Sequence, residues 1–272
     1  MPDLVTLLPM FLLLIVIGAF AGVIGGLLGV GGGIVLVPAF FYAFQHLGYG
    51  GDQLMQICVA TSLATIVVTS IRSVNGHNRK GAVDWGVLRV WGPFLVLGAV
   101  VGVFVASRLA STTLQAVFGV LAGLAGLYMA FGRASWRLGS ALPGQPGAGV
   151  MAAAVGFLSV LMGIGGGTFG VPLMTLFNQP IHRAVGTASG FGVLIAVPSV
   201  IGFAFLKVEG APPFTVGAIS LPAFLVVIAT TLFTTPLGVR LAHAMDPGPL
   251  KRVFAVFLIL VALNMLRKVA GW

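Results

Sequence analysis

Two glycine-rich phrases are the first residues in this sequence whose type and spacing suggest chemistry. Residues 29–38 read GVGGGIVLVP and residues 163–172 read GIGGGTFGVP, both in apolar surroundings. Three successive glycines are unfavourable inside a helix, at roughly 1 kcal/mol each relative to alanine, so each phrase predicts a break followed by a short helix. The first N–H groups of a helix have no partner within it, and its N-terminus carries partial positive charge. Each break is therefore a candidate site for a small anion.

Hydroxyl residues follow each break. Residues 59–62 read VATS and residues 185–189 read VGTAS, each near the start of the next apolar segment. Hydroxyls donate hydrogen bonds to an oxyanion without adding a fixed charge. The alternative is a hydrogen bond back to a carbonyl oxygen one turn earlier, which is common in membrane helices. The candidate substrate-binding residues are Gly31, Gly32, Gly33, Thr61, Ser62, Gly165, Gly166, Gly167, Thr168, Thr187 and Ser189.

A second set of candidates lies at the end of the apolar segment that begins near residue 54. Arg72, Asn75 and His77 would form a basic vestibule that gathers anions. The alternative is that they are ordinary positively charged anchors at the cytoplasmic membrane surface.

The composition identifies the class of protein. Of the 272 residues, 58% are hydrophobic and only 7% are charged. A soluble domain of this size cannot hide so much apolar surface, so we predict an all-α polytopic membrane protein. The net charge is +9, but Lys and Arg gather near the ends of apolar runs, so nucleic acid is not an expected partner. The expected partners are a small anionic substrate and the lipid bilayer, and a homo-oligomer is left open.

The apolar runs add up to roughly eight to ten helical segments at about 20 residues per full span. The segment after the first break covers residues 34–44 and reaches about 17 Å, which is short of the roughly 30 Å hydrocarbon core. We therefore expect the short segment after each break to re-enter the membrane or to cross with a neighbour's help. The predicted segments are about 4–28, 34–44, 54–74, 85–107 and 114–131, then 150–163, 168–177, 182–205, 214–241 and 250–266.

The order of these segments and several short matches indicate an internal repeat. Residues 253–256 echo residues 117–120, and the tripeptide RLA occurs at 108–110 and again at 240–242. We predict a first transmembrane repeat over 1–131, a cytoplasmic linker over 132–147 and a second repeat over 148–272. Glycines four residues apart, such as Gly18, Gly22 and Gly26, predict close packing between helices.

The distribution of Lys and Arg weakly favours inverted repeats. If the first two segments of each half return to the side where they began, ten of the 14 Lys and Arg residues face the cytoplasm, against nine for parallel repeats. Residues 1–71 contain neither Lys nor Arg, which fits an N-terminus outside. The ten are Arg72, Arg79, Lys80, Arg89, Arg133, Arg137, Arg183, Arg240, Lys251 and Arg252, and the other four are Arg108, Lys207, Arg267 and Lys268.

The acidic residues bear on ion coupling, because intramembrane acids are the usual carriers of coupling protons. None of the five acids is expected at the middle of a span, so we predict neither a carboxylate proton relay nor cation selectivity. Export of an anion from an inside-negative cell is downhill by about 2.3 kcal/mol per charge per 100 mV, so uniport would suffice. The acids are Asp3, Asp52, Asp84, Glu209 and Asp246.

The sequence offers no arrangement typical of an enzyme. It contains neither a nucleophile paired with a base nor a metal-binding set such as HExxH. His46, His182 and His243 are isolated near loops and show no metal-ligand spacing. We predict no catalytic residue, no metal and no cofactor, and the single cysteine, Cys58, excludes an internal disulfide.

The doubled GxGGG motif, followed by VP in each copy, resembles the TauE/SafE family of sulfite exporters. The hydroxyl-bearing openings at 59–62 and 185–189 fit the same pattern, as does the HxxKGxVDW loop at 77–85. The resemblance covers essentially the whole chain. It implies transport of sulfite or organosulfonates across the bacterial inner membrane. Where the family commonly has a Thr-Ser pair, residues 187–189 read TAS, so the resemblance leaves open which hydroxyl of that half contacts the ligand.

These inferences predict an inner-membrane transporter that exports a small sulfur-containing oxyanion by alternating access around a central site at the two breaks. The alternatives are an anion channel, and a transporter or importer of another anion such as thiosulfate or a carboxylate.

Overall fold

The computed structural model describes residues 4–29, 31–132, 136–244 and 247–271, and the side chains of these residues outside 4–10 and 247–254. The described residues form ten α-helices and one two-stranded antiparallel ribbon. The helices are α1 (Leu4–Leu28), α2 (Gly33–His46), α3 (Leu54–Asn78), α4 (Trp85–Ala106), α5 (Ser111–Phe131), α6 (Gly147–Met162), α7 (Gly167–Leu176), α8 (Ile181–Ala204), α9 (Leu221–Ala244) and α10 (Pro247–Val269); the strands are β1 (Thr215–Val216) and β2 (Ile219–Ser220).

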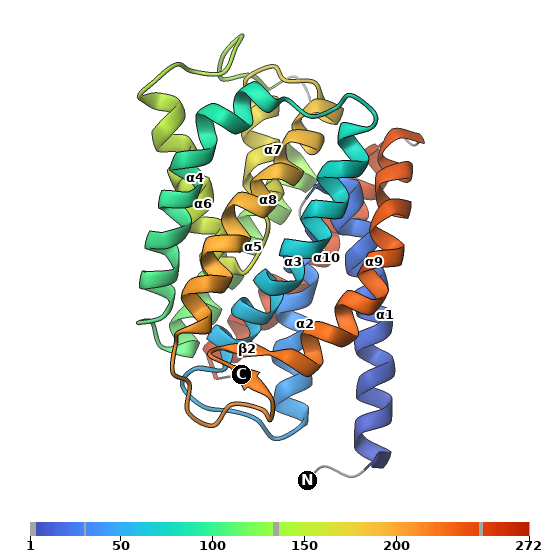
Figure 1. The fold of residues 1–272 in the computed structure, drawn as a ribbon, viewed down its shortest axis with the longest axis vertical. Helices are drawn as coiled ribbons and strands as arrows, with labels where there is room; N and C mark the ends of the chain where they lie inside the picture. Colours follow the sequence, from blue (N-terminus) through green and yellow to red (C-terminus); the bar gives the residue numbers. More distant parts are fainter. Residues whose placement is uncertain (1–3, 30, 133–135, 245–246, 272) are drawn as a thin grey trace.

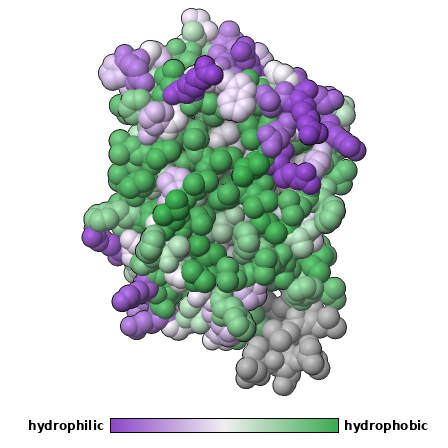
Figure 2. All heavy atoms as spheres, in the orientation of Figure 1, coloured by the Kyte–Doolittle hydropathy of each residue, from purple (hydrophilic) through white to green (hydrophobic). Residues whose placement is uncertain are grey.

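The helices are those of a multi-pass membrane protein. Six of the described helices, α1, α3, α4, α5, α8 and α9, are long and apolar enough to cross a membrane. The space-filling view shows apolar side chains over the middle of the molecule and hydrophilic side chains toward its two ends (Figure 2). An apolar belt of this kind suits a lipid environment, because lipid tails offer no hydrogen-bond partners.

The chain path can be followed in Figure 1. Helix α1 rises from the lower end, and α2 runs back toward that end. Helices α3, α4 and α5 then run up, down and up. Helix α6 descends from the upper end and α7 returns to it, after which α8, α9 and α10 run down, up and down. Each helix pair that flanks a glycine phrase is therefore a hairpin within the bundle, and the two hairpins enter from opposite ends.

Hydrogen bonds between loops tie the lower end together. The N–H of Ser111 donates to the carbonyl of Asp52 at 2.9 Å, and the N–H of Glu209 donates to Gln53 Oε1 at 3.2 Å. The connections after α2, α4 and α8 therefore lie side by side.

A matching set of contacts joins the loops of the upper end. Arg183 forms a salt bridge with Asp84 at 3.2 Å, and Arg137 Nε donates to Asn178 Oδ1 at 3.1 Å. The connections after α3, α5 and α7 therefore lie at this end.

Small residues let the helix backbones approach closely, as the sequence pattern predicts. On α1, Gly18 faces Thr230 of α9, and Gly26 lies against the backbone of Thr235 of the same helix. On α4, Gly98 lies against the backbone of Ala153 of α6. Helix α1 thus packs mainly on α9, and α4 mainly on α6.

The start of α9 differs from the sequence prediction. We expected a helix from about residue 214, but β1 and β2 occupy 215–220 and α9 begins at Leu221. Phe214 and Gly217 have left-handed φ values of 60° and 59°, which a continuous helix cannot accommodate. Gly217 lies in the turn between β1 and β2, where positive φ values are common. Residues 214–220 are therefore not helical, although the sequence had placed them in the apolar helix.

Candidate functional site

The first glycine phrase breaks the α1–α2 hairpin. Helix α1 ends at Leu28 and α2 begins at Gly33. Gly29, Gly31 and Gly32 have φ values of 67°, 74° and 78°, in the left-handed region that glycine adopts without steric cost. Val30 lies outside the described residues. Gly32 also sits where a Cβ atom would come within 2.5 Å of the Ala21 carbonyl oxygen. Glycine is therefore required at position 32 for two reasons: the left-handed backbone conformation and the lack of space for a side chain.

The second phrase breaks the α6–α7 hairpin in a different conformation. Gly163 ends α6 with a left-handed φ of 63°, and the N–H of Ile164 donates to the Ser159 carbonyl at 2.9 Å. Gly166, which precedes α7, has φ −61°, and its space is limited by the Phe191 side chain. The two breaks are therefore related in sequence but not identical in structure.

The two breaks meet at mid-height of α3. Ser62 Oγ donates to the Gly163 carbonyl oxygen at 2.7 Å. A Cβ atom on Gly33 would collide with that same carbonyl oxygen and with Ser62 Oγ. Gly163 also lies against Val59 of α3. Residues 31–33 and 163–167 therefore converge in the interior, and residues 31–33 and 165–167 are buried.

The hydroxyls of Thr61 and Thr187 accept hydrogen bonds from backbone N–H groups just before the starts of two other helices. Thr61 Oγ1 accepts from the N–H of Ser220, just before α9, at 3.0 Å. Thr187 Oγ1 accepts from the N–H of Asp84, just before α4, at 2.9 Å. Both side chains are buried. Each hydroxyl thus has a structural partner, and its role toward a ligand stays a prediction.

Ser189 of α8 also has partners within the protein. Its Oγ donates to the Val185 carbonyl at 3.0 Å, which is the back-bond expected as an alternative to ligand binding. It also forms a hydrogen bond with Ser73 Oγ of α3 at 2.9 Å. Of the four predicted α3 and α8 hydroxyls, Ser62 is the one hydrogen-bonded to a break.

Three buried hydroxyls near the breaks have no hydrogen-bond partner. They are Ser70 Oγ on α3, Ser159 Oγ on the last turn of α6 and Thr168 Oγ1 on the first turn of α7. Ser70 Oγ lies beside Gly31. Unsatisfied buried hydroxyls are costly, so they mark places that suit a polar ligand. Thr168 was among the sequence candidates, whereas Ser70 and Ser159 were missed; the position of Ser159 four residues before Gly163 was the available signal.

The structure divides the three vestibule candidates. Arg72 and Asn75 are exposed near the upper end of α3, and Arg72 Nη2 donates to the Leu232 carbonyl of α9 at 3.3 Å. His77 is only 1% exposed. Its Nε2 atom is 2.9 Å from the Gly26 carbonyl oxygen, so it contacts α1 and does not face solvent as a vestibule residue would.

The prediction that His182 and His243 are isolated was wrong. His77 Nδ1 and His243 Nε2 are hydrogen-bonded at 3.0 Å, and the rings of His182 and His243 stack with centroids 5.4 Å apart. These three histidines bring α3, α8 and α9 together at the upper end. Within the described part of the chain, no group of three His, Cys, Asp or Glu residues is arranged to hold a metal ion.

The interior around the breaks carries polar groups without fixed charge. Among the described side chains, the buried polar ones are hydroxyls, amides and the imidazole of His77, and none belongs to Lys, Arg, Asp or Glu. Asp84 caps α4 by accepting from the N–H groups of Gly86 and Val87. Asp52 and Glu209 lie in loops. Asp3, Asp246 and Arg133 lie outside the described residues, as do the side chains of Lys251 and Arg252.

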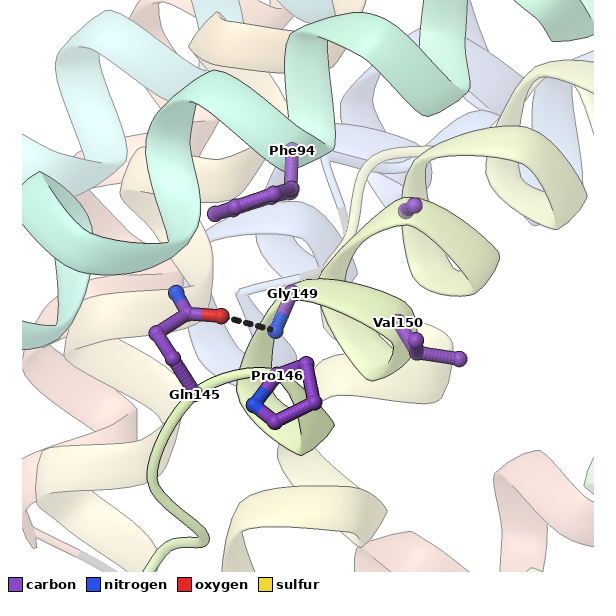
Figure 3. A pocket seen from close by; sticks show the side chains of 6 residues that line it. Phe94, Gln145, Pro146, Gly149 and Val150 are labelled. Carbon is purple, nitrogen blue, oxygen red and sulfur yellow. Dashed lines mark hydrogen bonds between the residues drawn. The ribbon is translucent and has the colours of Figure 1, made fainter.

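A separate groove of about 450 Å³ lies between α4 and the start of α6 (Figure 3). Phe94, Pro146 and Val150 line it, and Gln145 Oε1 accepts from the N–H of Gly149 at its edge. None of the predicted site residues lines this groove.

The fold and the buried breaks are those of a multi-pass membrane protein, and the comparisons with known proteins define its class as a membrane transporter. Residues 14–265 match the family "Sulfite exporter TauE/SafE". The chain belongs to the TauE/SafE sulfite exporter family, as the glycine motifs indicated.

Similar proteins come from bacteria and an archaeon. The chain is 32% identical to a "Probable membrane transporter protein" of Haemophilus influenzae, over 94% of this chain and 98% of that protein. It is 26% identical to a probable membrane transporter protein of Methanocaldococcus jannaschii, over 93% and 94% of the two chains. It is also 26% identical to "Probable membrane transporter protein YunE" of Bacillus subtilis, over 94% and 97%. No solved structure gives a significant match.

Proposed function

We propose that this protein is an inner-membrane exporter of a small sulfur-containing oxyanion, such as sulfite or an organosulfonate. The observation that carries the proposal is the meeting of the two glycine breaks inside the bundle, where Ser62 joins α3 to Gly163. Helix N-termini and uncharged donors stabilise an anion, and the buried described side chains include no acid that would repel it. Membership of a sulfite exporter family supports the substrate class.

We further propose that residues 1–131 and 148–272 are inverted repeats joined by a cytoplasmic linker at 132–147. Reciprocal contacts between the halves support this. Gly29 lies against Val185 of α8, and the corresponding Gly163 lies against Val59 of α3. The packing of α1 on α9 has its counterpart in the packing of α6 on α4. Such reciprocity is expected of two repeats related by a pseudo-twofold axis.

The hydroxyl contacts between the two halves are reciprocal in the same way. Thr61 in the first half accepts from the N–H that precedes α9, and Thr187 in the second half accepts from the N–H that precedes α4. These two threonines hold corresponding places in the two hydroxyl motifs. The match supports a duplicated unit in which each half positions a helix of the other.

The upper end of Figure 1 is proposed as the cytoplasmic end. Cytoplasmic loops of membrane proteins carry the excess of Lys and Arg. The described basic residues at that end are Arg72, Arg79, Lys80, Arg89, Arg137, Arg183 and Arg240, and those at the lower end are Arg108, Lys207, Arg267 and Lys268.

The proposed mechanism is alternating access around the breaks. The anion would sit near the N-termini of α2 and α7, and the two halves would move relative to one another to expose it at either end. The hydroxyls of Thr61, Ser62, Thr187 and Ser189 would hold the surrounding helices and complete the shell of the ligand. Because the anion is the only charged species required, the membrane potential would drive export without a coupling ion.

The test is uptake of labelled sulfite into proteoliposomes of the purified protein under a potassium diffusion potential of either sign. The proposal predicts saturable uptake that is faster when the lumen is positive. Competition by organosulfonates, thiosulfate and acetate would rank the substrates. Protein-free liposomes give the leak. Absence of protein-dependent sulfite or sulfonate uptake at either potential would refute the proposal.

A further inference from the structure

The two breaks differ in the groups that they offer to an anion. Thr168 stands in the first turn of α7, and its Oγ1 is buried without a partner. The residue in the matching position of α2 is Ile34, which has no hydroxyl. Ser159, four residues before Gly163, is also unpartnered, whereas Gly25 holds the matching place before Gly29. The second break alone is therefore flanked by hydroxyls on both sides along the chain.

Protein atoms already occupy the space around the first break. A Cβ atom on Gly33 would collide with the Gly163 carbonyl oxygen, and one on Gly32 would lie 2.5 Å from the Ala21 carbonyl oxygen. The Gly31 carbonyl accepts from Thr69 Oγ1 at 3.1 Å. Carbonyl oxygens near the N-terminus of α2 carry partial negative charge, so they oppose an anion there.

Helix α7 has ten residues, and the N–H groups of its first turn have no partner inside the helix. Two further buried donors flank this break along the chain: Thr168 Oγ1 in the first turn of α7 and Ser159 Oγ in the last turn of α6. Thr168 is 2% exposed and Ser159 is fully buried. Leaving such hydroxyls without a partner costs free energy, which a bound oxyanion would recover.

From these observations we infer that the anion binds at the second break, on the N-terminus of α7 with Thr168 and Ser159, and that this site accepts monovalent oxyanions and rejects divalent ones. The inference rests on the proposed function and names the part of the central site that binds. The first break then serves as the packing partner of the site.

The preference for a single charge follows from the lack of cationic side chains near the site. Among the described side chains, no Lys or Arg is buried. The cost of removing an ion from water rises steeply with its charge. Hydroxyl and N–H donors repay that cost for a monoanion such as a sulfonate or hydrogen sulfite. They repay a smaller share of it for a dianion such as sulfate, because the desolvation cost of a double charge is several times larger.

Trp91 offers a direct reading of occupancy. Its ring stacks on Phe191, with centroids 5.5 Å apart and an interplanar angle of 13°. Phe191 in turn lies directly against Gly166 and Gly170 at the start of α7. An anion entering the second break therefore changes the surroundings of this ring pair. Trp85 and Trp136, in contrast, are about half exposed to solvent. A Trp91→Phe variant identifies the part of the fluorescence that comes from Trp91.

The experiment is a fluorescence titration of the purified full-length protein with methanesulfonate, and then with sulfate, at constant ionic strength. We expect a saturable change for methanesulfonate that is lost in Trp91→Phe. Thr168→Val and Ser159→Ala should each raise the Kd about 10-fold to 100-fold, because each removes a hydrogen bond to an anion. Thr168→Ser, which keeps the hydroxyl, should restore most of the affinity.

Matched controls separate the loss of these donors from general damage. Thr175→Val lies on the same helix and removes a hydroxyl that donates to the Pro172 carbonyl. Ser199→Ala removes a buried hydroxyl that donates to the Ile195 carbonyl. Both should bind methanesulfonate with a Kd within about twofold of the wild type, since neither flanks a break.

Three results would overturn the inference. The first is a Thr168→Val, Ser159→Ala double variant that binds as the wild type does. The second is loss of binding on Ser70→Ala alone, which would move the site to the first break. The third is sulfate binding as tightly as methanesulfonate. Each is distinct from failure of the proposed function. Binding reported by Trp91 without uptake into proteoliposomes would refute transport but would leave the inferred anion site standing.

Discussion

Ser62 Oγ of α3 donates a 2.7 Å hydrogen bond to the carbonyl oxygen of Gly163, the residue that follows the end of α6. This bond links the hydroxyl motif of the first half to the glycine break of the second half, across 101 positions of sequence. Both groups are buried, so the carbonyl depends on this hydroxyl for satisfaction. The contact makes the two halves a single structural unit at the proposed site.

Replacing Ser62 with alanine should destabilise the protein by about 1–3 kcal/mol, because it leaves the buried Gly163 carbonyl without this donor. We expect the midpoint of thermal unfolding in detergent to be lower for this variant than for the wild type. Ser107→Ala is the control, since Ser107 Oγ donates to the Phe104 carbonyl at an exposed helix end. Equal midpoints for Ser62→Ala and Ser107→Ala would show that the bond does not contribute.

Gly33→Ala should be more disruptive than loss of one hydrogen bond. The new Cβ atom would meet the Gly163 carbonyl oxygen, the Ile66 side chain and Ser62 Oγ, and a backbone carbonyl cannot move aside without shifting α6. We expect reduced yield of monodisperse protein and loss of sulfite uptake. Gly50→Ala, in a loop with open space around the position, should behave as the wild type does. Normal yield and uptake for Gly33→Ala would contradict the close meeting of the breaks.

Arg72→Gln tests the vestibule prediction for an exposed cation. If Arg72 attracts anions to the upper end, the KM for sulfite should rise about twofold to fivefold at low ionic strength, and the effect should fade at high salt as charges are screened. Arg108→Gln is the matched control at the lower end, where the guanidinium lies 3.4 Å from the Phe104 ring centroid. The two variants should be compared in inside-out vesicles, in which added sulfite enters from the proposed cytoplasmic end, where Arg72 lies. A salt-independent change, or none, would leave Arg72 with an anchoring role only.

His243→Ala should weaken the upper end of the bundle. The substitution removes the partner of His77 Nδ1 and the ring that stacks on His182. We expect a loss of about 1–2 kcal/mol in unfolding free energy, as for other buried groups left without a hydrogen bond. His46→Ala is the control, because His46 is exposed at the end of α2. A midpoint unchanged by His243→Ala would mean that the histidine contacts do not stabilise the packing of α3, α8 and α9.

Much of the helical architecture could be predicted from local pattern. Consecutive glycines cannot continue a helix cheaply, so the ends of α1 at Leu28 and α6 at Met162 fall next to the predicted breaks. Glycines spaced four apart identified a packing face on α1. What the spacing could not show is its partner. That α1 packs on α9, which comes late in the chain, depends on how the described helices share one bundle.

The polar residues of the site were harder to assign. Thr61 and Thr187 are buried because they bind the backbone at the starts of α9 and α4, and hydroxyls that serve this purpose look the same in sequence as hydroxyls that bind ligand. His182 and His243 lie 61 positions apart, so only the packing of α8 and α9 makes them neighbours. Ser159 stands four residues before Gly163 but outside both motifs, and it was singled out by burial without a partner.

Counterflow of labelled sulfite distinguishes a carrier with one alternating site from a channel. Proteoliposomes are loaded with a high concentration of unlabelled sulfite and diluted into a low concentration of labelled sulfite, with the membrane potential clamped at zero. A carrier that alternates around one central site predicts transient accumulation of label above its outside concentration, faster than in vesicles loaded with an inert anion such as gluconate. Label that enters without accumulation, at a rate that does not saturate and does not respond to internal sulfite, would contradict alternating access and identify a channel.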